Sequence, residues 1–175
     1  MIPINLIQYR IANLSFGVGT FRRQPSGTTQ AAINFCRDLG LIDFSSIKNE
    51  DEYLNELGKQ TNLLMEKLPS KSWGIARKAL NIFLFQTAHD IILSAKYNLT
   101  KLIPYLEVPL DNPNALKLKN KAKQEGIILN WKNIKDLKKI DSDAFQKYAK
   151  KIAQDEHNCS RCYLDLFYWR ADQSN

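Results

Sequence analysis

The stretch SWGIARKALNIFLFQTAHDIILSAKY, residues 72–97, decides the fold class of this 175-residue chain. Its apolar residues recur every three or four positions, the spacing that places side chains on one face of an α-helix. They are Ala76, Ala79, Leu80, Phe83, Ala88, Ile91 and Ile92. A helix this apolar is mostly buried in a globular protein. The stretch therefore predicts a long central helix against which the rest of the chain packs.

Segments with helix start and stop signals lie on both sides of this stretch. The further predicted helices cover residues 28–40, 46–68, 111–126, 141–156 and 163–170. Thr28, Asp111 and Asp141 stand where capping side chains are favoured. Gly40 and Gly126 stand where helices commonly end. Because no run alternates convincingly with period two, we expect an all-α fold, a compact single-domain helical bundle over residues 1–175.

Composition narrows the class of protein. Hydrophobic residues make up 44% and charged residues 25% of the chain, which is close to the average of globular proteins. No apolar run approaches the roughly 18 residues of a membrane span, and the first ten residues lack a secretory pattern. Three cysteines in a chain of this size do not suggest a disulfide framework. We expect a protein with no membrane partner in a reducing compartment, the cytoplasm or, in a prokaryote, the nucleoid.

The net charge of +7 is concentrated in one part of the chain. Eleven lysines and four acidic residues lie between Lys117 and Lys151, a balance that equals the charge of the whole chain. Such a concentration creates a local field that attracts phosphate backbones. We expect double-stranded DNA as the partner, with phosphate contacts from Lys117, Lys119, Lys121 and Lys123. The alternative is an ordinary solvated, lysine-rich surface.

Residues 16–27 form the one glycine-rich stretch, and it carries the adjacent pair Arg22 and Arg23. Paired arginines in such a loop can meet an anion. The stretch lacks the Lys-Ser or Lys-Thr end of a phosphate-binding loop. An ordinary connecting loop is the expected structure.

Three residues near the end of the chain, His157, Cys159 and Cys162, are of types that bind zinc. A structural zinc site needs four ligands, and the only other histidine, His89, lies on the central apolar stretch. The Cys-x-x-Cys spacing lacks the strand of a thioredoxin-like unit. We therefore predict no metal and no cofactor.

Residues 68–84, LPSKSWGIARKALNIFL, resemble the hairpin and following helix of the helix-hairpin-helix DNA glycosylases, the endonuclease III group. The pattern of that family is Leu-Pro-Gly-Val-Gly-Arg-Lys-Thr-Ala-Asn followed by apolar residues. Gly74, Arg77, Lys78, Asn81 and Leu84 match it in register. The resemblance implies a helix-hairpin-helix-like element, and it implies that Lys78 is the nucleophile of the bifunctional enzymes.

Residues 106–114, LEVPLDNPN, resemble the Val-Asp-Thr-His stretch of the same family, and Asp111 would be its essential aspartate. The chain departs from the family at Ala76, in place of the second hairpin glycine, and at Pro113, in place of the histidine. The 33 positions from Lys78 to Asp111 also exceed the family spacing. The cysteine loop that holds an iron–sulfur cluster is absent from the sequence.

These residue types suit base excision from DNA. An unprotonated Lys78 amine can attack the sugar C1′ as a base leaves and form a Schiff base. Asp111 can stabilise the positive charge that develops on the sugar. Trp73 can stack on an extruded base, while Gly74 and Arg77 would contact DNA from the hairpin. The predicted function is a DNA glycosylase, with lyase activity if Lys78 is the nucleophile.

Other interpretations stay open on the sequence alone. Lys78 can be an ordinary solvated helix residue, and Asp111 can simply cap the helix that Pro113 begins. The chain would then be a non-catalytic DNA-binding or structural domain that keeps the hairpin. A third possibility is a protein-interaction domain whose basic surface is incidental.

Overall fold

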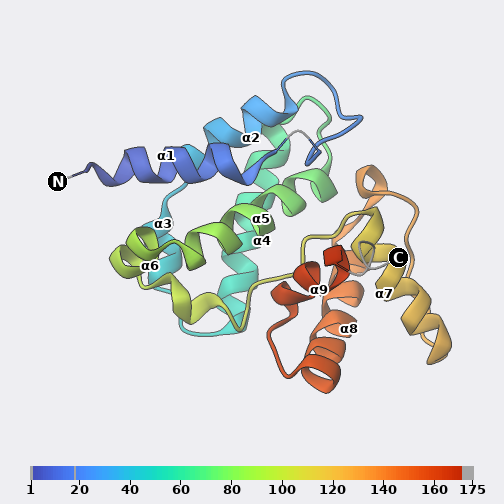
Figure 1. The fold of residues 1–175 in the computed structure, drawn as a ribbon. Helices are drawn as coiled ribbons and strands as arrows, with labels where there is room; N and C mark the ends of the chain where they lie inside the picture. The colour runs from blue at the N-terminus through green and yellow to red at the C-terminus, as the bar shows by residue number, and fades with distance from the viewer. Residues whose placement is uncertain (1, 18, 171–175) are drawn as a thin grey trace.

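Helices form the fold in the computed structural model, which describes residues 2–17 and 19–170 and the side chains as far as Tyr168 (Figure 1). The α-helices are α1 (Ile4–Ser15), α2 (Thr28–Arg37), α3 (Leu41–Ser45), α4 (Glu50–Lys67), α5 (Trp73–His89), α6 (Ile91–Tyr97), α7 (Asn112–Gln124), α8 (Lys139–His157) and α9 (Leu164–Arg170). Short 3-10 helices are η1 (Leu99–Leu102), η2 (Ile134–Asp136) and η3 (Arg161–Tyr163). No strand occurs within the two described ranges, so the all-α prediction is confirmed.

Two clusters of buried apolar side chains divide the molecule into lobes. The N-terminal lobe, α1 to α6 with η1, packs around side chains that include Leu57, Leu80 and Phe83. The C-terminal lobe, α7 to α9, packs around side chains that include Leu118 and Phe145. Figure 1 shows α5 crossing the middle of the N-terminal lobe, with its first residues directed toward the C-terminal lobe. The start of α5 therefore lies where the two lobes meet.

The central helix begins and breaks at identifiable side chains. The Ser72 hydroxyl accepts the N–H of Ile75 at 3.4 Å and caps α5. The predicted single helix over 72–97 is wrong at its second half, because it stops at His89 and restarts as α6. Asp90 has an extended conformation, and its carboxylate accepts the N–H groups of Ile92 and Leu93 at 3.0 and 2.8 Å. A capping aspartate thus starts a new helix inside a continuous apolar pattern.

Other boundaries also differ from those predicted. Helix α1 was not predicted; it places Ile4, Ile7, Ile11 and Ala12 against the N-terminal core. Thr28 is the first residue of α2 rather than its cap, and its hydroxyl donates to the Pro25 carbonyl at 2.7 Å. Helix α8 starts at Lys139, two residues before the predicted cap Asp141. Gly126 ends α7 as predicted, with φ of 74° and its N–H bonded to the Lys123 carbonyl.

A buried ion pair fastens α5 to the segment between η1 and α7. Arg77 donates through Nε and Nη2 to the two oxygens of Glu107 at 2.8 and 2.9 Å, and both side chains are almost fully buried. Asn81 donates to the same carboxylate at 3.1 Å, and Thr61 of α4 accepts from Arg77 at 3.2 Å. Burial alone would raise the pKa of Glu107, but the Arg77 charge and these hydrogen bonds hold it below its usual value.

The chain crosses from one lobe to the other at residues 106–110, where side chains form hydrogen bonds with polar groups of the backbone. Gln146 of α8 accepts the N–H of Val108 at 3.1 Å and donates to its carbonyl at 2.8 Å. Arg161 donates to the carbonyls of Tyr105 and Leu106 and pairs with Glu50 at 3.0 Å. These bonds fix the position of the crossing relative to both lobes.

Candidate functional site

A cleft of about 780 Å³ lies between the loop after α1, the start of α5 and the C-terminal lobe. It is lined by residues 19–24 of the loop, Ile75 and Lys78 of α5, residues 111–113 at the start of α7, and residues 133–136 around η2. Figure 1 shows these segments converging at one end of α5. The cleft is therefore built from four parts of the chain that are distant in sequence.

Lys78 and Asp111 meet in this cleft. The Lys78 Nζ lies 3.4 Å from Asp111 Oδ2, and it also donates to the Thr20 carbonyl at 3.1 Å. The Lys78 side chain is 12% exposed and that of Asp111 is 32% exposed, so both remain open to a ligand in the cleft. The two residues that the sequence predicts as a catalytic pair thus line the same cavity, although 33 positions separate them.

Asp111 is also the cap of α7. Its Oδ1 accepts the N–H of Asn114 at 3.1 Å while Oδ2 faces Lys78. The capping interpretation and the cleft interpretation of Asp111 are therefore compatible, because the two oxygens of one carboxylate serve different partners.

A second carboxylate lies behind this pair. The buried Asn114 amide donates to the Pro109 carbonyl at 2.8 Å and to Asp165 Oδ1 of α9 at 2.6 Å. Burial raises the pKa of Asp165; the Asn114 hydrogen bond opposes this rise, the charge of Asp111 adds to it, and the charge of Lys78 lowers it. Neither residue is among the predicted site residues. Asn114 lies in the capping turn that Asp111 begins, but only the packing of α9 on α7 brings Asp165 to the Asn114 amide.

Two predicted DNA contacts are corrected by the structure. Arg77 is 2% exposed and its guanidinium is bound by Glu107, so it lies in the core rather than on a binding surface. Gly74 is buried against η2, where a Cβ would lie 2.1 Å from the Ile134 carbonyl oxygen. Both residues that match the glycosylase pattern at these positions have structural roles here.

Trp73 lies at the junction of the lobes and does not line the cleft. Its partly buried ring packs against the C-terminal core, with the Arg77 guanidinium carbon 5.4 Å from the ring centroid. The predicted stacking on an extruded base thus has no support from its position.

Three of the four lysines of α7 interact with other parts of the chain. Lys117 donates to the Tyr168 carbonyl at 2.5 Å, Lys119 to the Trp131 carbonyl at 3.4 Å, and Lys121 pairs with Glu156. Lys123 is exposed. None of these four lysines lines the cleft that holds Lys78 and Asp111.

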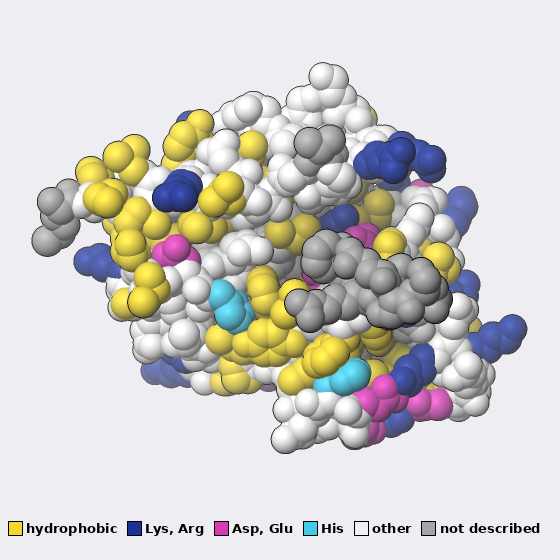
Figure 2. Space-filling model, in the orientation of Figure 1, with side chains coloured by type: hydrophobic (Ala, Val, Ile, Leu, Met, Phe, Trp, Pro, Cys, Tyr) yellow, Lys and Arg dark blue, Asp and Glu magenta, His cyan; other side chains and the backbone are white. Residues whose placement is uncertain are grey.

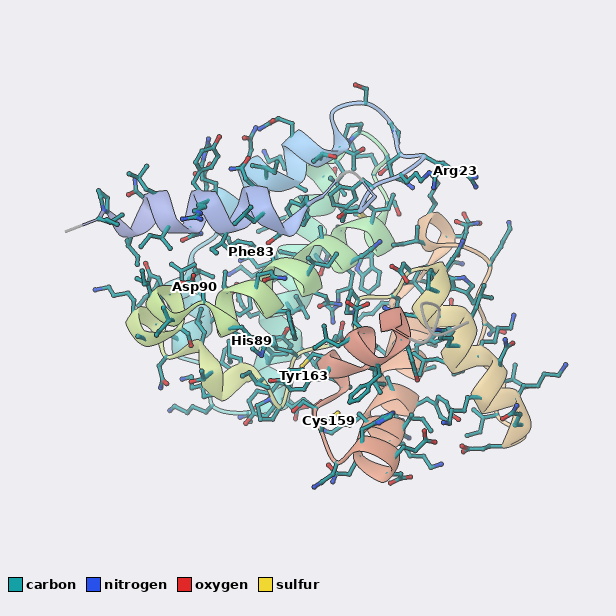
Figure 3. The ribbon with its side chains drawn as sticks, in the orientation of Figure 1. Arg23, Phe83, His89, Asp90, Cys159 and Tyr163 are labelled. Carbon is teal, nitrogen blue, oxygen red and sulfur yellow. The ribbon has the colours of Figure 1, made fainter. Side chains whose placement is uncertain are left out.

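Three other cations line the cleft: Arg22, Arg23 and Lys135. All three are exposed, and Figure 3 shows Arg23 projecting outward from the loop after α1. The sequence predicts an ordinary connecting loop for the arginine pair. Only the fold brings this loop to the same cleft as η2.

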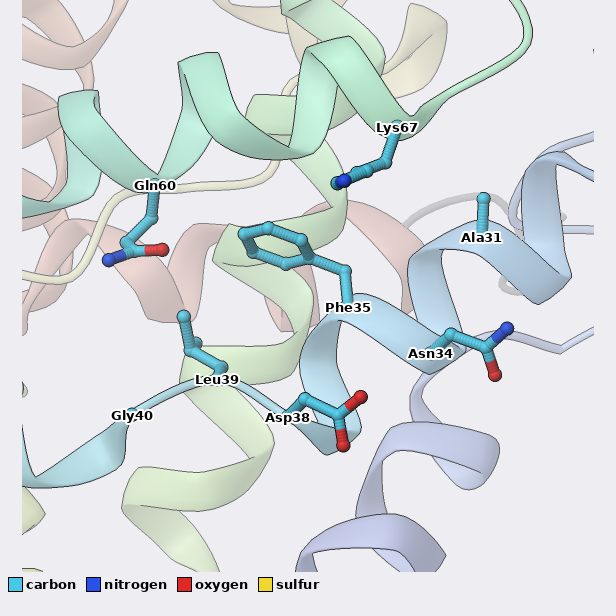
Figure 4. Close-up of a pocket in the computed structure, with 8 residues that line it drawn as sticks. All are labelled: Ala31, Asn34, Phe35, Asp38, Leu39, Gly40, Gln60 and Lys67. Atoms are coloured by element: carbon cyan, nitrogen blue, oxygen red, sulfur yellow. The ribbon is translucent and has the colours of Figure 1, made fainter.

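Other candidate sites offer less chemistry. A pocket of about 490 Å³ between α2 and α4 has the Phe35 ring between Gln60 and Lys67 (Figure 4), and its acidic residue, Asp38, is paired with Arg37 at 2.7 Å. Burial raises the pKa of Cys162 to about 12 and also raises that of Cys159, the opposite of a reactive cysteine pair. Within the described residues, no three acidic, histidine or cysteine side chains are grouped as metal ligands.

Exposed apolar side chains gather away from the cleft. They belong to α1 with the residue before it, and to α6: Ile2, Leu6, Leu14, Ile91 and Ile92. Figure 2 shows apolar side chains clustered at the end of the molecule where these helices lie. None of the helices described is long and apolar enough to cross a bilayer.

Comparison of the chain with protein-family models, with curated proteins and with solved structures gave no significant match. The functional argument therefore depends on the chemistry of the cleft.

Proposed function

We propose that the protein binds double-stranded DNA at this cleft and excises a base from it, with Lys78 and Asp111 as the reacting groups. The observation that supports the proposal is the 3.4 Å approach of Lys78 Nζ to Asp111 Oδ2 inside an open cavity. An amine next to a carboxylate at the wall of a cleft is the pair of groups that base release followed by imine formation needs.

The chemistry can be written with these two side chains. The Lys78 ammonium passes a proton through Asp111 to the departing base, which leaves with the electron pair of the glycosidic bond. The amine lone pair then forms the bond to C1′. A second proton moves from nitrogen to O4′ as the C1′–O4′ bond opens, and a protonated imine remains. The Asp111 carboxylate, negative in the resting pair, stabilises the positive sugar in between.

Borohydride trapping tests the proposal, because hydride reduces the imine to a stable amine that links protein and DNA. Duplexes that contain oxidised, alkylated or deaminated bases or an abasic site are the probes. We expect Lys78→Gln to abolish trapping and Asp111→Asn to slow base release by about 100-fold or more, the usual effect of removing a transition-state contact. Lys96→Gln, an exposed α6 lysine outside the cleft, is the matched control and should trap normally.

A second candidate function is a non-catalytic DNA-binding domain. The observation that favours it is the bonding of the Lys78 ammonium, which pairs with Asp111 and donates to the Thr20 carbonyl. A lysine with a purely structural role would make the same kind of contacts. Binding to every duplex without base release or trapping would support this second candidate and refute excision. Base release without trapping would instead point to water as the nucleophile, with Asp111 activating it.

A further inference from the structure

We infer that Arg22, Arg23 and Lys135 form a phosphate clamp across the cleft and hold the sugar-phosphate backbone of the strand whose nucleotide enters it. The inference rests on the proposed function, and it names the part of the surface that binds DNA. It places the main electrostatic contact at the cleft rather than on the α7 lysines.

The charges of the cleft lining are unbalanced in favour of cations. Of the two carboxylates that line it, Asp111 is paired with Lys78, and Asp136 is paired with Lys132 at 3.2 Å and bonded by Asn133 at 2.8 Å. Arg22, Arg23 and Lys135 have no ion-pair partner in the part of the chain that the structure describes. Unpaired cations around a concave surface concentrate a positive potential there.

The loop that carries the two arginines is anchored in the core. Phe21, next to Arg22, is 9% exposed, and its ring centroid lies 5.2 Å from that of Phe16. The Arg22 N–H bonds to the Gly19 carbonyl at 3.3 Å, and the Thr20 carbonyl accepts from Lys78. The backbone of this loop is therefore tied both to the N-terminal core and to the proposed nucleophile.

The opposite side of the clamp is fixed to α5. The Lys135 N–H donates to the Asn133 side chain at 2.8 Å, and the Lys135 carbonyl accepts from the Ser72 hydroxyl at 3.2 Å. Gly74 permits this close packing of η2 on the first turn of α5. The Lys135 ammonium, in contrast, extends from an exposed side chain. On each side of the clamp, the backbone is thus held by hydrogen bonds while the charged side chains are exposed.

The size of the cleft limits what part of a nucleic acid can enter. A volume of about 780 Å³ is in the range of small-molecule pockets, so it accepts a single nucleotide and not a duplex. A nucleotide leaves the base stack by rotation about its backbone, which brings its flanking phosphates to the mouth of the pocket that receives it. Cations on both sides of the mouth match the two flanking phosphates.

The salt dependence of duplex binding tests the clamp. Each phosphate contact contributes about 0.9 to the slope of log affinity against log salt. With a duplex that carries an abasic site as the probe, we expect Arg22→Gln/Arg23→Gln to lower this slope by about 2 and Lys135→Gln to lower it by about 1. Arg22→Lys/Arg23→Lys keeps the charges and should keep the slope.

The matched control is Lys96→Gln/Lys147→Gln, which removes two exposed charges outside the cleft and should leave the slope unchanged. Equal slopes for this control and for Arg22→Gln/Arg23→Gln would overturn the clamp, even if the wild type releases a base. A wild type that binds through the clamp but releases no base would refute excision and leave the clamp standing. Absence of duplex binding at about 50 mM salt would overturn both.

Discussion

Asp111 combines a structural contact and a cleft contact in one carboxylate, and the two can be separated by the choice of substitution. Asparagine caps helices about as well as aspartate does, whereas alanine costs about 1 kcal/mol at a cap. We expect Asp111→Ala to have a free energy of unfolding about 1 kcal/mol lower than that of Asp111→Asn in urea titrations. Equal stabilities of the two variants would show that the bond to the Asn114 N–H contributes nothing.

The buried pair of Arg77 and Glu107 makes the free energy of unfolding depend on pH in the acid range. The pKa of Glu107 is lowered in the folded protein, so its contribution is fully present above the unfolded value of about 4.3 and is lost as the pH falls through the folded value. We expect Glu107→Gln to lower the free energy of unfolding by about 3 kcal/mol at neutral pH, because the Arg77 charge stays buried without its partner. The variant should also lose less additional stability below about pH 4 than the wild type.

The control for this prediction is Glu66→Gln, which removes a surface carboxylate paired with Lys71. Its effect on unfolding should stay below about 1 kcal/mol, as for other exposed pairs. An equally steep fall of the free energy of unfolding at acid pH in the wild type and in Glu107→Gln would contradict the account of the buried pair.

At the scale of elements, the contact of η2 with α5 depends on the absence of a side chain at Gly74. An added Cβ would meet the Ile134 carbonyl oxygen at 2.1 Å and the Leu137 Cβ at 2.8 Å. We expect Gly74→Ala to lower the free energy of unfolding by about 3 kcal/mol, the upper part of the usual range for overpacking. Chemical shifts of residues 133–137 should move most, since η2 must shift away from α5.

Gly58→Ala is the comparison that isolates this clash. Gly58 lies inside α4 with no atom within 4 Å of an added Cβ, so alanine should stabilise the protein by about 1 kcal/mol through helix propensity. A neutral Gly74→Ala would mean that η2 does not pack on α5 as described.

Helical spacing was enough to predict most elements but not their ends. The apolar pattern continues without a gap on both sides of Asp90. The break at this residue depends on its capping bonds, which the spacing of apolar residues does not reveal. Helix α1 has Ile4, Ile7 and Ile11 at helical spacing, so its apolar side is readable from the sequence. Helix α8 starts at Lys139, and its N-cap residue Lys138 makes no capping bond through its side chain, so no residue type marks the beginning of the helix.

For the whole molecule, the sequence marked Lys78 and Asp111, which meet in the cleft, whereas the α7 lysines predicted to contact DNA do not line it. Lys78 and Asp111 were found because a local pattern marks each of them. Arg77 matches the same pattern, but its partner Glu107 lies 30 positions away and draws it into the core. The lysine-rich stretch is visible in the sequence because its lysines lie close together along the chain. Arg22, Arg23 and Lys135, in contrast, come to line one cleft only through the packing of η2 and the loop.

The bonds of Arg161 predict how the lobes unfold. This side chain is 4% exposed and joins η3 to Glu50 and to the carbonyls of Tyr105 and Leu106. In the wild type, far-ultraviolet dichroism and tryptophan fluorescence should report one shared thermal transition. In Arg161→Met, tryptophan fluorescence, to which Trp73 and Trp131 on the C-terminal core contribute, should change at a lower temperature than the dichroism. Coincident transitions in the variant would contradict this coupling.

The reciprocal bonds between Gln146 and Val108 have a mechanical consequence. They occupy both polar groups of the backbone at the point where the chain passes between the lobes. A protein that closes on its ligand bends at such a connection, and this one is held straight by a side chain from α8. Bending at this connection would break both bonds, so we expect the width of the cleft to change little when a ligand binds. Under the proposed function, the distortion would then have to come from the DNA, so we expect flexible base steps and weakened pairs to be engaged faster than stiff, fully stacked sequence.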